Sequence, residues 1–200
     1  NHKLNLKPWI DLQKKIKKIK HKVKIAVVGK YTNLKDSYKS LNEALVHGGI
    51  ENSAEVIIQW INSEKENNIS LIKKLKGCDG ILIPGGFGIR GINGKINAIK
   101  YARENNIPFF GICLGMQLAV IEIAQNVLKI KNAHSSEFKK TTKSVVGLMT
   151  EWVNKNKIEK RDKNSDKGGT MRLGAYKAVL KKNSKIFSIY KNKLISERHR

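Results

Sequence analysis

A short apolar run that leads into a glycine-flanked cysteine constrains the fold of this chain more than any other stretch. Phe109–Ile112 has the composition of a buried strand, and Met116–Val127 is a long apolar segment suited to a helix. Between them Cys113 is flanked by Gly111 and Gly115. A sharp strand-to-helix turn requires small neighbours, because the chain passes close to itself and the central residue adopts a strained conformation. The pattern therefore predicts a strand, a tight elbow and a helix.

The predicted elbow gives Cys113 the environment of a nucleophile. At a helix N-terminus the unpaired amides and the helix dipole favour thiolate over thiol. The same amides can stabilise a developing oxyanion. The alternative is that Cys113 packs as a small apolar side chain, which is common for free cysteines and is our interpretation of Cys78. A second glycine cluster upstream favours the nucleophile.

Strand-like and helix-like segments alternate along most of the chain. This alternation predicts an α/β fold with a doubly wound, mostly parallel sheet and helices on both faces. Between the last two expected strands, Asn154–Gly169 is polar and is expected to be an exposed, mobile loop. The expected strands are Val23–Gly29, Glu55–Ile61, Ile81–Pro84, Phe109–Ile112, Val145–Met149 and Ala175–Leu180, and the expected helices include Tyr38–Leu45, Leu71–Leu75, Ile96–Asn105 and Met116–Val127.

The second glycine cluster, Gly85-Gly86-Phe87-Gly88, follows the strand at Ile81–Pro84. Ligands of such sheets bind beyond the carboxyl ends of the strands, so both glycine clusters are expected to face one pocket. The cluster is not a phosphate-binding P-loop, because G-x-x-x-x-G-K-[ST] does not occur in the sequence. It is either a tight connection or an oxyanion hole, in which the amides of Gly86 and Leu114 hold one oxygen.

The composition narrows the class of protein. A net charge of +24 makes nucleic-acid binding a candidate function, but the lysines are spread along the chain and only 6% of residues are aromatic. We interpret the charge as the codon bias of an AT-rich genome, and nucleic acid is not an expected partner. The alternative left open is a basic RNA- or partner-binding relic without catalysis. No signal peptide or bilayer-spanning apolar run occurs, which predicts a cytoplasmic location and no membrane partner.

The first 22 residues differ from the rest. Trp9, Leu12, Ile16 and Ile19 recur at helical spacing among lysines, which predicts a basic amphipathic helix. We interpret residues 1–22 as an interdomain connector and residues 23–200 as one domain, expected to be incomplete at its C-terminus.

Several motifs, in order along the chain, resemble the glutamine amidotransferase half of the CTP synthase family, within the class I glutamine amidotransferases. The similarity covers nearly everything from Val23 onward. The glycine-rich run Gly168–Gly174 and the run Arg103–Pro108 are the more particular to that family, and they argue against a different elbow-cysteine hydrolase or a redox sensor. The matching segments are Pro84–Gly88, Arg90-Gly91, Tyr101–Pro108, Gly111–Gln117, Ser136–Phe138, Thr150–Trp152, Gly168–Gly174 and Glu197–Arg200.

The resemblance implies a flavodoxin-like fold and a set of roles. Cys113 would attack the side-chain amide of L-glutamine, release ammonia and form a glutamyl thioester that water hydrolyses. Gly86 and Leu114 would supply the oxyanion amides. The glutamine-binding residues would be Gly86, Leu114, Gly115, Met116, Gln117 and Glu137, with Glu137 facing the α-amino group.

The resemblance also implies partners outside this segment. A synthetase domain of the same parent chain would use ATP and Mg to aminate UTP to CTP, in a homotetramer. GTP would be an effector acting through a lid that resembles Arg161–Gly169, although Lys167 stands where the family usually has an apolar residue. No cofactor or metal ion is expected in this segment itself.

The general base of the family is not found. The family takes its histidine and orienting carboxylate from a His-Pro-Glu motif, which does not occur in these 200 residues. His134, near Glu137, is the one tempting substitute, and His199 lies in a Glu-Arg-His-Arg run. We therefore expect this chain to be catalytically incompetent by itself.

Overall fold

The structure is a computed structural model that describes residues 4–30, 35–86, 88–147, 151–154, 157–160 and 174–199. For residues 35, 151–154, 157–160 and 199 it describes the backbone alone. The chain divides into two compact units, Asn1–Leu148 and Met149–Arg200. The predicted boundary between a connector and a domain at residue 22 stays a prediction.

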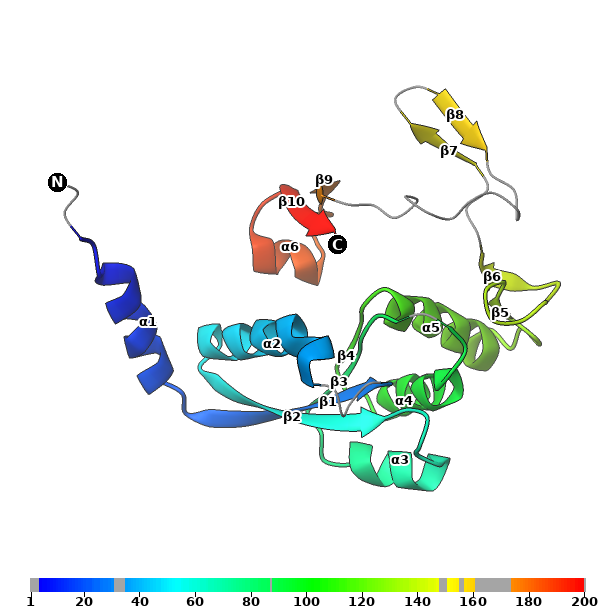
Figure 1. Cartoon of the computed structure of the whole chain (residues 1–200), viewed down its shortest axis with the longest axis horizontal. Helices are drawn as coiled ribbons and strands as arrows, with labels where there is room; N and C mark the ends of the chain where they lie inside the picture. Colours follow the sequence, from blue (N-terminus) through cyan, green and yellow to red (C-terminus); the bar gives the residue numbers. More distant parts are fainter. Residues whose placement is uncertain are drawn as a thin grey trace. The chain divides into compact units, whose positions relative to one another are not determined.

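A four-stranded parallel sheet forms the centre of the first unit, in the order β2-β1-β3-β4 (Figure 1). Its strands are β1 (His21–Gly29), β2 (Ala54–Asn62), β3 (Gly80–Ile83) and β4 (Phe109–Gly111). Each of them overlaps a strand expected from the sequence. Val27, Val28 and Ile83 have no exposed surface, as expected for central parallel strands covered on both faces.

Helices connect the strands and flank the sheet, so the predicted α/β fold is confirmed. Figure 1 shows α2 (Lys39–Glu51) and α3 (Asn68–Leu75) on opposite sides of the sheet. α4 (Ile92–Glu104) leads from β3 to β4, and α5 (Leu114–Glu122) follows β4. Several expected helix bounds were wrong: α2 continues through Gly48 and Gly49, and α3 and α4 begin three and four residues before the expected Leu71 and Ile96. The segment after α5, Ile123–Val127, is a π-helical turn. A 3-10 turn, Lys35–Tyr38, precedes α2.

The core lies between the sheet and α3, α4 and α5. Its largest apolar members come from both layers: Ile61, Leu71, Leu75, Ile81, Ile83, Leu114, Leu118 and Ile121. One carboxylate is buried with them. Glu122 of α5 accepts hydrogen bonds from Arg103 of α4, with Nη2–Oε1 at 2.8 Å and Nε–Oε1 at 3.1 Å. Because burying an unpaired carboxylate is very unfavourable, this pair fixes α5 against α4.

The predicted N-terminal helix is present as α1 (Lys7–Lys17). Its apolar side chains are exposed, with Trp9 at 69%, and Lys15 forms an ion pair with Glu51 of α2. The role of this helix as a connector stays a prediction. Among the described residues, no helix is both long enough and apolar enough to cross a membrane.

The described residues after the π-helical turn form short strands and one helix. In the first unit β5 (His134–Ser135) pairs with β6 (Ser144–Val146), and β6 falls within the predicted strand Val145–Met149 except for its first residue. In the second unit β9 (Gly174–Val179) and β10 (Leu194–His199) pair antiparallel around α6 (Lys185–Tyr190), and β9 matches the predicted strand Ala175–Leu180.

The expected loop at Asn154–Gly169 was partly wrong. β7 (Glu151–Asn154) and β8 (Lys157–Lys160) form an antiparallel hairpin, so part of the polar stretch pairs as a strand. Main-chain pairing in a hairpin does not require apolar side chains, which is why polarity alone was misleading. The lid-like run Arg161–Gly169 and the motif residues 168–173 lie outside the described residues.

Candidate active site

Cys113 lies at the predicted elbow, in a strained backbone conformation. It precedes the first residue of α5, with φ at 51° and ψ at −105°. A positive φ is rare for a residue with a side chain and is costly, so surrounding structure must hold it. The Cys113 side chain is exposed, whereas Cys78 is buried. The elbow therefore presents its thiol to solvent.

Both flanking glycines are required by close backbone contacts. A Cβ atom on Gly115 would lie 2.2 Å from the carbonyl oxygen of Ile83, the last residue of β3. A Cβ atom on Gly111 would lie 2.5 Å from the carbonyl carbon of Gly115. Neither distance is possible for a real side chain. The small neighbours expected from the sequence are thus explained by the packing of Gly115 onto β3 and of Gly111 onto the start of α5.

Hydrogen bonds fix the same turn. Ile112 N donates to Ile83 O at 2.9 Å, Gly115 N donates to Ile112 O at 2.9 Å, and Gln117 N donates to Cys113 O at 3.1 Å. The first bond joins the turn to β3, and the other two start the helix. Leu114, as the first residue of α5, has an amide without an intrahelical acceptor, which is the property that an oxyanion donor needs.

The second glycine cluster lies directly against the elbow. A Cβ atom on Gly85 would be 3.4 Å from Cys113 Cβ, and one on Gly86 would be 4.0 Å from Leu114 Cδ2. The two clusters are therefore neighbours at the carboxyl edge of the sheet, where β3 and β4 end. Phe87, between the glycines, lies outside the described residues.

Two buried lysines lie near this turn, and sequence reasoning missed both. Lys30 follows β1 and is 6% exposed, and its Nζ donates to the carbonyl oxygen of Gly88 at 3.0 Å. Lys95 of α4 is 1% exposed. Burial, and next the charge of Lys30, lower the pKa of Lys95 to about 8, while Glu64 opposes the shift. A lysine directly after a buried strand was the one available signal.

The other expected glutamine-binding residues occupy two segments. Leu114, Gly115, Met116 and Gln117 form the first turn of α5; Leu114 and Gly115 are buried, Gln117 is half-buried and Met116 is exposed. Glu137 follows β5, is exposed, and its backbone N donates to Ser135 Oγ at 3.2 Å. That these residues bind glutamine stays a prediction.

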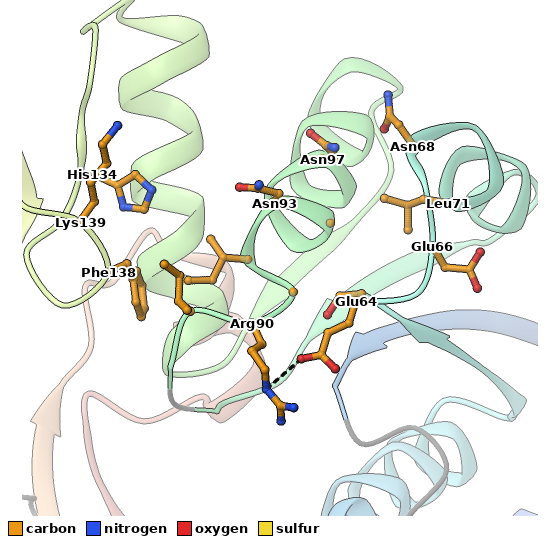
Figure 2. A pocket seen from close by; sticks show the side chains of 15 residues that line it. Glu64, Glu66, Asn68, Leu71, Arg90, Asn93, Asn97, His134, Phe138 and Lys139 are labelled. Atoms are coloured by element: carbon orange, nitrogen blue, oxygen red, sulfur yellow. Dashed lines mark ion pairs between the residues drawn. The ribbon is translucent and has the colours of Figure 1, made fainter.

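A cavity of about 620 Å³ lies between α3, α4 and the loop after β5 (Figure 2). Arg90 and Gly91, at the C-terminal end of the glycine turn, line this cavity, but Cys113 does not. Arg90 Nε is 3.2 Å from Glu64 Oε1 at its rim. Its lining residues include Ser63, Glu64, Glu66, Asn68, Leu71, Asn93, Asn97, His134, Phe138 and Lys139.

His134 belongs to this cavity. Burial, and next the charge of Lys139, lower the pKa of His134, and its Nδ1 accepts a hydrogen bond from Ser135 N at 3.0 Å. The structure thus gives His134 a location in the cavity and no contact with Cys113 among the described residues. Within the described part of the chain, no group of three or more His, Cys, Asp or Glu residues is placed to hold a metal ion.

The elbow, the neighbouring glycine turn and the parallel sheet agree with one family. The profile of "Glutamine amidotransferase class-I" matches residues 33–200. The chain belongs to the class I glutamine amidotransferases. The family resemblance inferred from the motifs is therefore confirmed.

Individual relatives point to one branch of this family. The CTP synthase of Pelagibacter ubique is 58% identical over 198 residues, which are 98% of this chain and 36% of the relative. The CTP synthase of Nitrobacter winogradskyi is 54% identical, with coverage of 98% and 36%. The chain thus spans about a third of the length of these relatives.

A solved structure supports the fold. The glutaminase domain of Trypanosoma brucei CTPS, with bound acivicin, has a TM-score of 0.73 and 40% sequence identity. The match covers 89% of this chain and 66% of that chain. Both the parallel sheet and the flanking helices are shared with this amidotransferase, and the flavodoxin-like fold class is confirmed.

Proposed function

We propose that this chain is the glutamine-hydrolysing segment of a CTP synthase and that Cys113 is its nucleophile. The observation that carries the proposal is the elbow. Cys113 has a positive φ and an exposed thiol, and there is no room for a side chain at the flanking positions Gly111 and Gly115. A structural cysteine needs none of these features. The 58% identity to a CTP synthase supplies the substrate class.

The proposed first step is attack of the Cys113 sulfur on the side-chain amide carbon of L-glutamine. A carbon–sulfur bond forms, and the carbonyl oxygen becomes an oxyanion held by the amides of Gly86 and Leu114. Collapse of the adduct breaks the carbon–nitrogen bond and releases ammonia, with a proton supplied by a general acid. Water then hydrolyses the glutamyl thioester to glutamate.

Residues around the elbow would hold the substrate. Four of these residues follow the thiol in the first turn of α5: Leu114, Gly115, Met116 and Gln117. Gly86 lies in the neighbouring glycine turn. A glutamine side chain bound at the thiol would therefore contact them. The carboxylate of Glu137 suits the cationic α-amino group of glutamine. These assignments rest on the family resemblance and on the position of the first turn of α5.

The general base is the missing component. The 200 residues contain no His-Pro-Glu, and His134 lies in a cavity whose lining does not include Cys113. We propose that this chain alone forms adducts at Cys113 but does not turn over glutamine. Sustained ammonia release from glutamine that disappears in Cys113→Ala would refute the second statement.

The remaining partners belong to the proposed parent enzyme. Ammonia would pass to a synthetase domain of the same chain, which uses ATP and Mg to aminate UTP, with GTP as an effector acting through the segment Arg161–Gly169. No residue described here is proposed to hold these nucleotides or the metal ion. A homotetramer in the cytoplasm is proposed for the intact enzyme.

The test is covalent labelling with acivicin, an electrophilic amino acid. The expected result is one adduct per chain, located on Cys113 by peptide mass spectrometry, and protection by added L-glutamine. Cys113→Ala should abolish the adduct and Cys78→Ala should retain it. Labelling of Cys78 instead, or labelling that glutamine does not slow, would overturn the proposal.

A further inference from the structure

Lys30 is linked to the glycine turn by a specific contact. It is the first residue after β1, and its Nζ reaches Gly88 O, five residues after the end of β3. Because β1 and β3 are adjacent and parallel, both of their carboxyl ends lie at the same edge of the sheet. An ammonium group from one strand end therefore holds the turn that leaves the next strand.

The turn needs such a contact because its sequence does not rigidify it. It contains Gly85, Gly86, Gly88 and Gly91, and Gly88 and Gly91 have φ of 79° and 71°. Glycines leave the backbone many accessible conformations, so a single conformation must be imposed by neighbours. The hydrogen bond from a charged donor to Gly88 O is stronger than a neutral one and suits that purpose.

The position of this turn determines the geometry opposite the thiol. Gly85 and Gly86 lie beside Cys113 and Leu114, because a Cβ atom added to each glycine would be 3.4 Å from Cys113 Cβ and 4.0 Å from Leu114 Cδ2. A displacement of the turn by a fraction of an ångström changes the separation of the Gly86 and Leu114 amides. Oxyanion donors act only when both lie within hydrogen-bond distance of one oxygen, so small displacements have large effects on rate.

Lys30 is buried close to a second lysine. Lys30 is 6% exposed and is close enough to the buried Lys95 for the two charges to interact. Placing two ammonium groups in one buried region costs free energy that an apolar side chain would not. A charged donor at this place therefore points to a role in geometry.

We propose that Lys30 is a positioning residue for the oxyanion hole: by donating to Gly88 O it sets the place of the Gly86 amide relative to Cys113. Lys30 does not touch the substrate in this proposal. The proposal rests on the function proposed above, because it presumes that Gly86 and Leu114 hold an oxyanion.

The experiment compares two reactions of Cys113 in the 200-residue chain. 4-Nitrophenyl acetate acylates the thiol: the carbon–sulfur bond forms through an oxyanion, and nitrophenolate leaves. Iodoacetamide alkylates the same thiol by displacing iodide at a saturated carbon, without an oxyanion. The ratio of the two rates, measured on the Cys113 peptide by mass spectrometry, isolates oxyanion stabilisation from thiol exposure and ionisation.

The folded wild-type chain should exceed its urea-unfolded form in this ratio by about tenfold or more. Lys30→Met should lower the ratio about tenfold, towards the unfolded value, and Lys30→Arg should keep it within about threefold of wild type. Lys22→Met is the matched control, because Lys22 lies on β1, the strand that Lys30 follows, but its side chain is exposed and paired with Glu55. It should leave the ratio unchanged.

Circular dichroism and thermal melting establish that each variant is folded, and Lys30→Gln replaces Lys30→Met if the latter cannot be purified. An unchanged ratio in the folded variant overturns the proposal, as does an equal loss of both rates or a loss in Lys30→Arg as large as that in Lys30→Met. If the folded and unfolded wild-type ratios are equal, the proposed function fails first, and the role of Lys30 falls with it.

Discussion

Cys78 and Cys113 occupy opposite edges of the same parallel sheet, and they differ in every property that matters for reactivity. Cys78 precedes β3, is 7% exposed, and its Sγ lies 3.6 Å from Lys74 O. Burial, and less strongly Asp79, raise the pKa of its thiol, with Lys24 opposing. Cys113 follows β4, is exposed, and has a positive φ.

The difference follows from the direction of the chain. At the amino edge of the sheet the chain arrives from the C-terminus of a helix, where carbonyl groups are directed at the turn. At the carboxyl edge it enters a helix N-terminus, where amides are unpaired. Cys78 therefore lies near the acceptor Lys74 O, whereas Cys113 directly precedes the unpaired amides of α5. Unpaired amides that can stabilise an oxyanion are thus found at the carboxyl edge, which agrees with the usual place of ligands in such sheets.

The largest expected effect comes from removing the elbow itself. Gly115→Ala should lower the free energy of unfolding by about 4 kcal/mol, because the new Cβ atom would collide with the backbone of β3. Urea denaturation followed by circular dichroism measures it. The control is Gly48→Ala in α2, where a Cβ atom meets nothing within 4 Å; it should raise the same free energy by about 0.5–1 kcal/mol. Equal effects of the two substitutions would contradict the elbow geometry.

The contrast between the two thiols should appear directly in their alkylation rates. In the folded chain at neutral pH, Cys113 should react with iodoacetamide about 100-fold faster than Cys78, because Cys78 is exposed only when the structure opens. Peptide-resolved mass spectrometry gives both rates. In concentrated urea the two rates should agree within about threefold. A persistent contrast in the unfolded chain would show that sequence neighbours, and not the fold, are responsible.

Lys95→Met should increase the difference between the alkylation rates of Cys113 and Cys78, because it should stabilise the fold. The lowered pKa of Lys95 means that the folded state disfavours its charge, so the penalty is full below pH 8 and is relieved as the pH rises from about 8 towards 10.5. At pH 7 the substitution should raise the free energy of unfolding by about 2 kcal/mol and slow Cys78 alkylation. Near pH 10 the two chains should differ little. Destabilisation at pH 7 would argue against a disfavoured charge.

The smallest expected effect comes from the helix that precedes Cys78. Asn67 caps α3 by accepting a hydrogen bond from Ser70 N at 2.9 Å. Asn67→Ala should cost about 1 kcal/mol and speed Cys78 alkylation about fivefold, while the Cys113 rate stays unchanged. Ser184, which caps α6 in the second unit, offers a control. Ser184→Ala should change neither rate. An effect of Asn67→Ala on the Cys113 rate would show that the two edges are coupled.

Much of the first unit was predictable because its signals are local. The apolar runs around Val27, Ile58 and Leu82 predicted strands, and the glycines around Cys113 predicted an elbow that the structure shows in detail. These signals depend on a few consecutive residues, whose side chains and backbone conformation determine the turn. The positive φ of Cys113 is the confirmed consequence.

What the sequence did not reveal depends on contacts between distant residues. Lys30 and Gly88 are 58 positions apart, and nothing in a lysine after a strand shows that its ammonium will be buried. The hairpin of β7 and β8 depends on backbone pairing that polar residues also form. His134 was singled out by its neighbour Glu137 in the sequence, whereas the fold places it in a cavity with Asn93 and Asn97.

The position of Ile83 determines how the elbow and the glycine turn move relative to each other. Its carbonyl oxygen accepts the hydrogen bond from Ile112 N and lies against Gly115, and Pro84 and the glycine turn begin at the next residue. The carbonyl group of Ile83 thus contacts the elbow and directly precedes the glycine turn, so it links the two turns. A movement of this part of the sheet therefore displaces both turns in the same direction. The distance between the glycine turn and the elbow then changes less than the position of either.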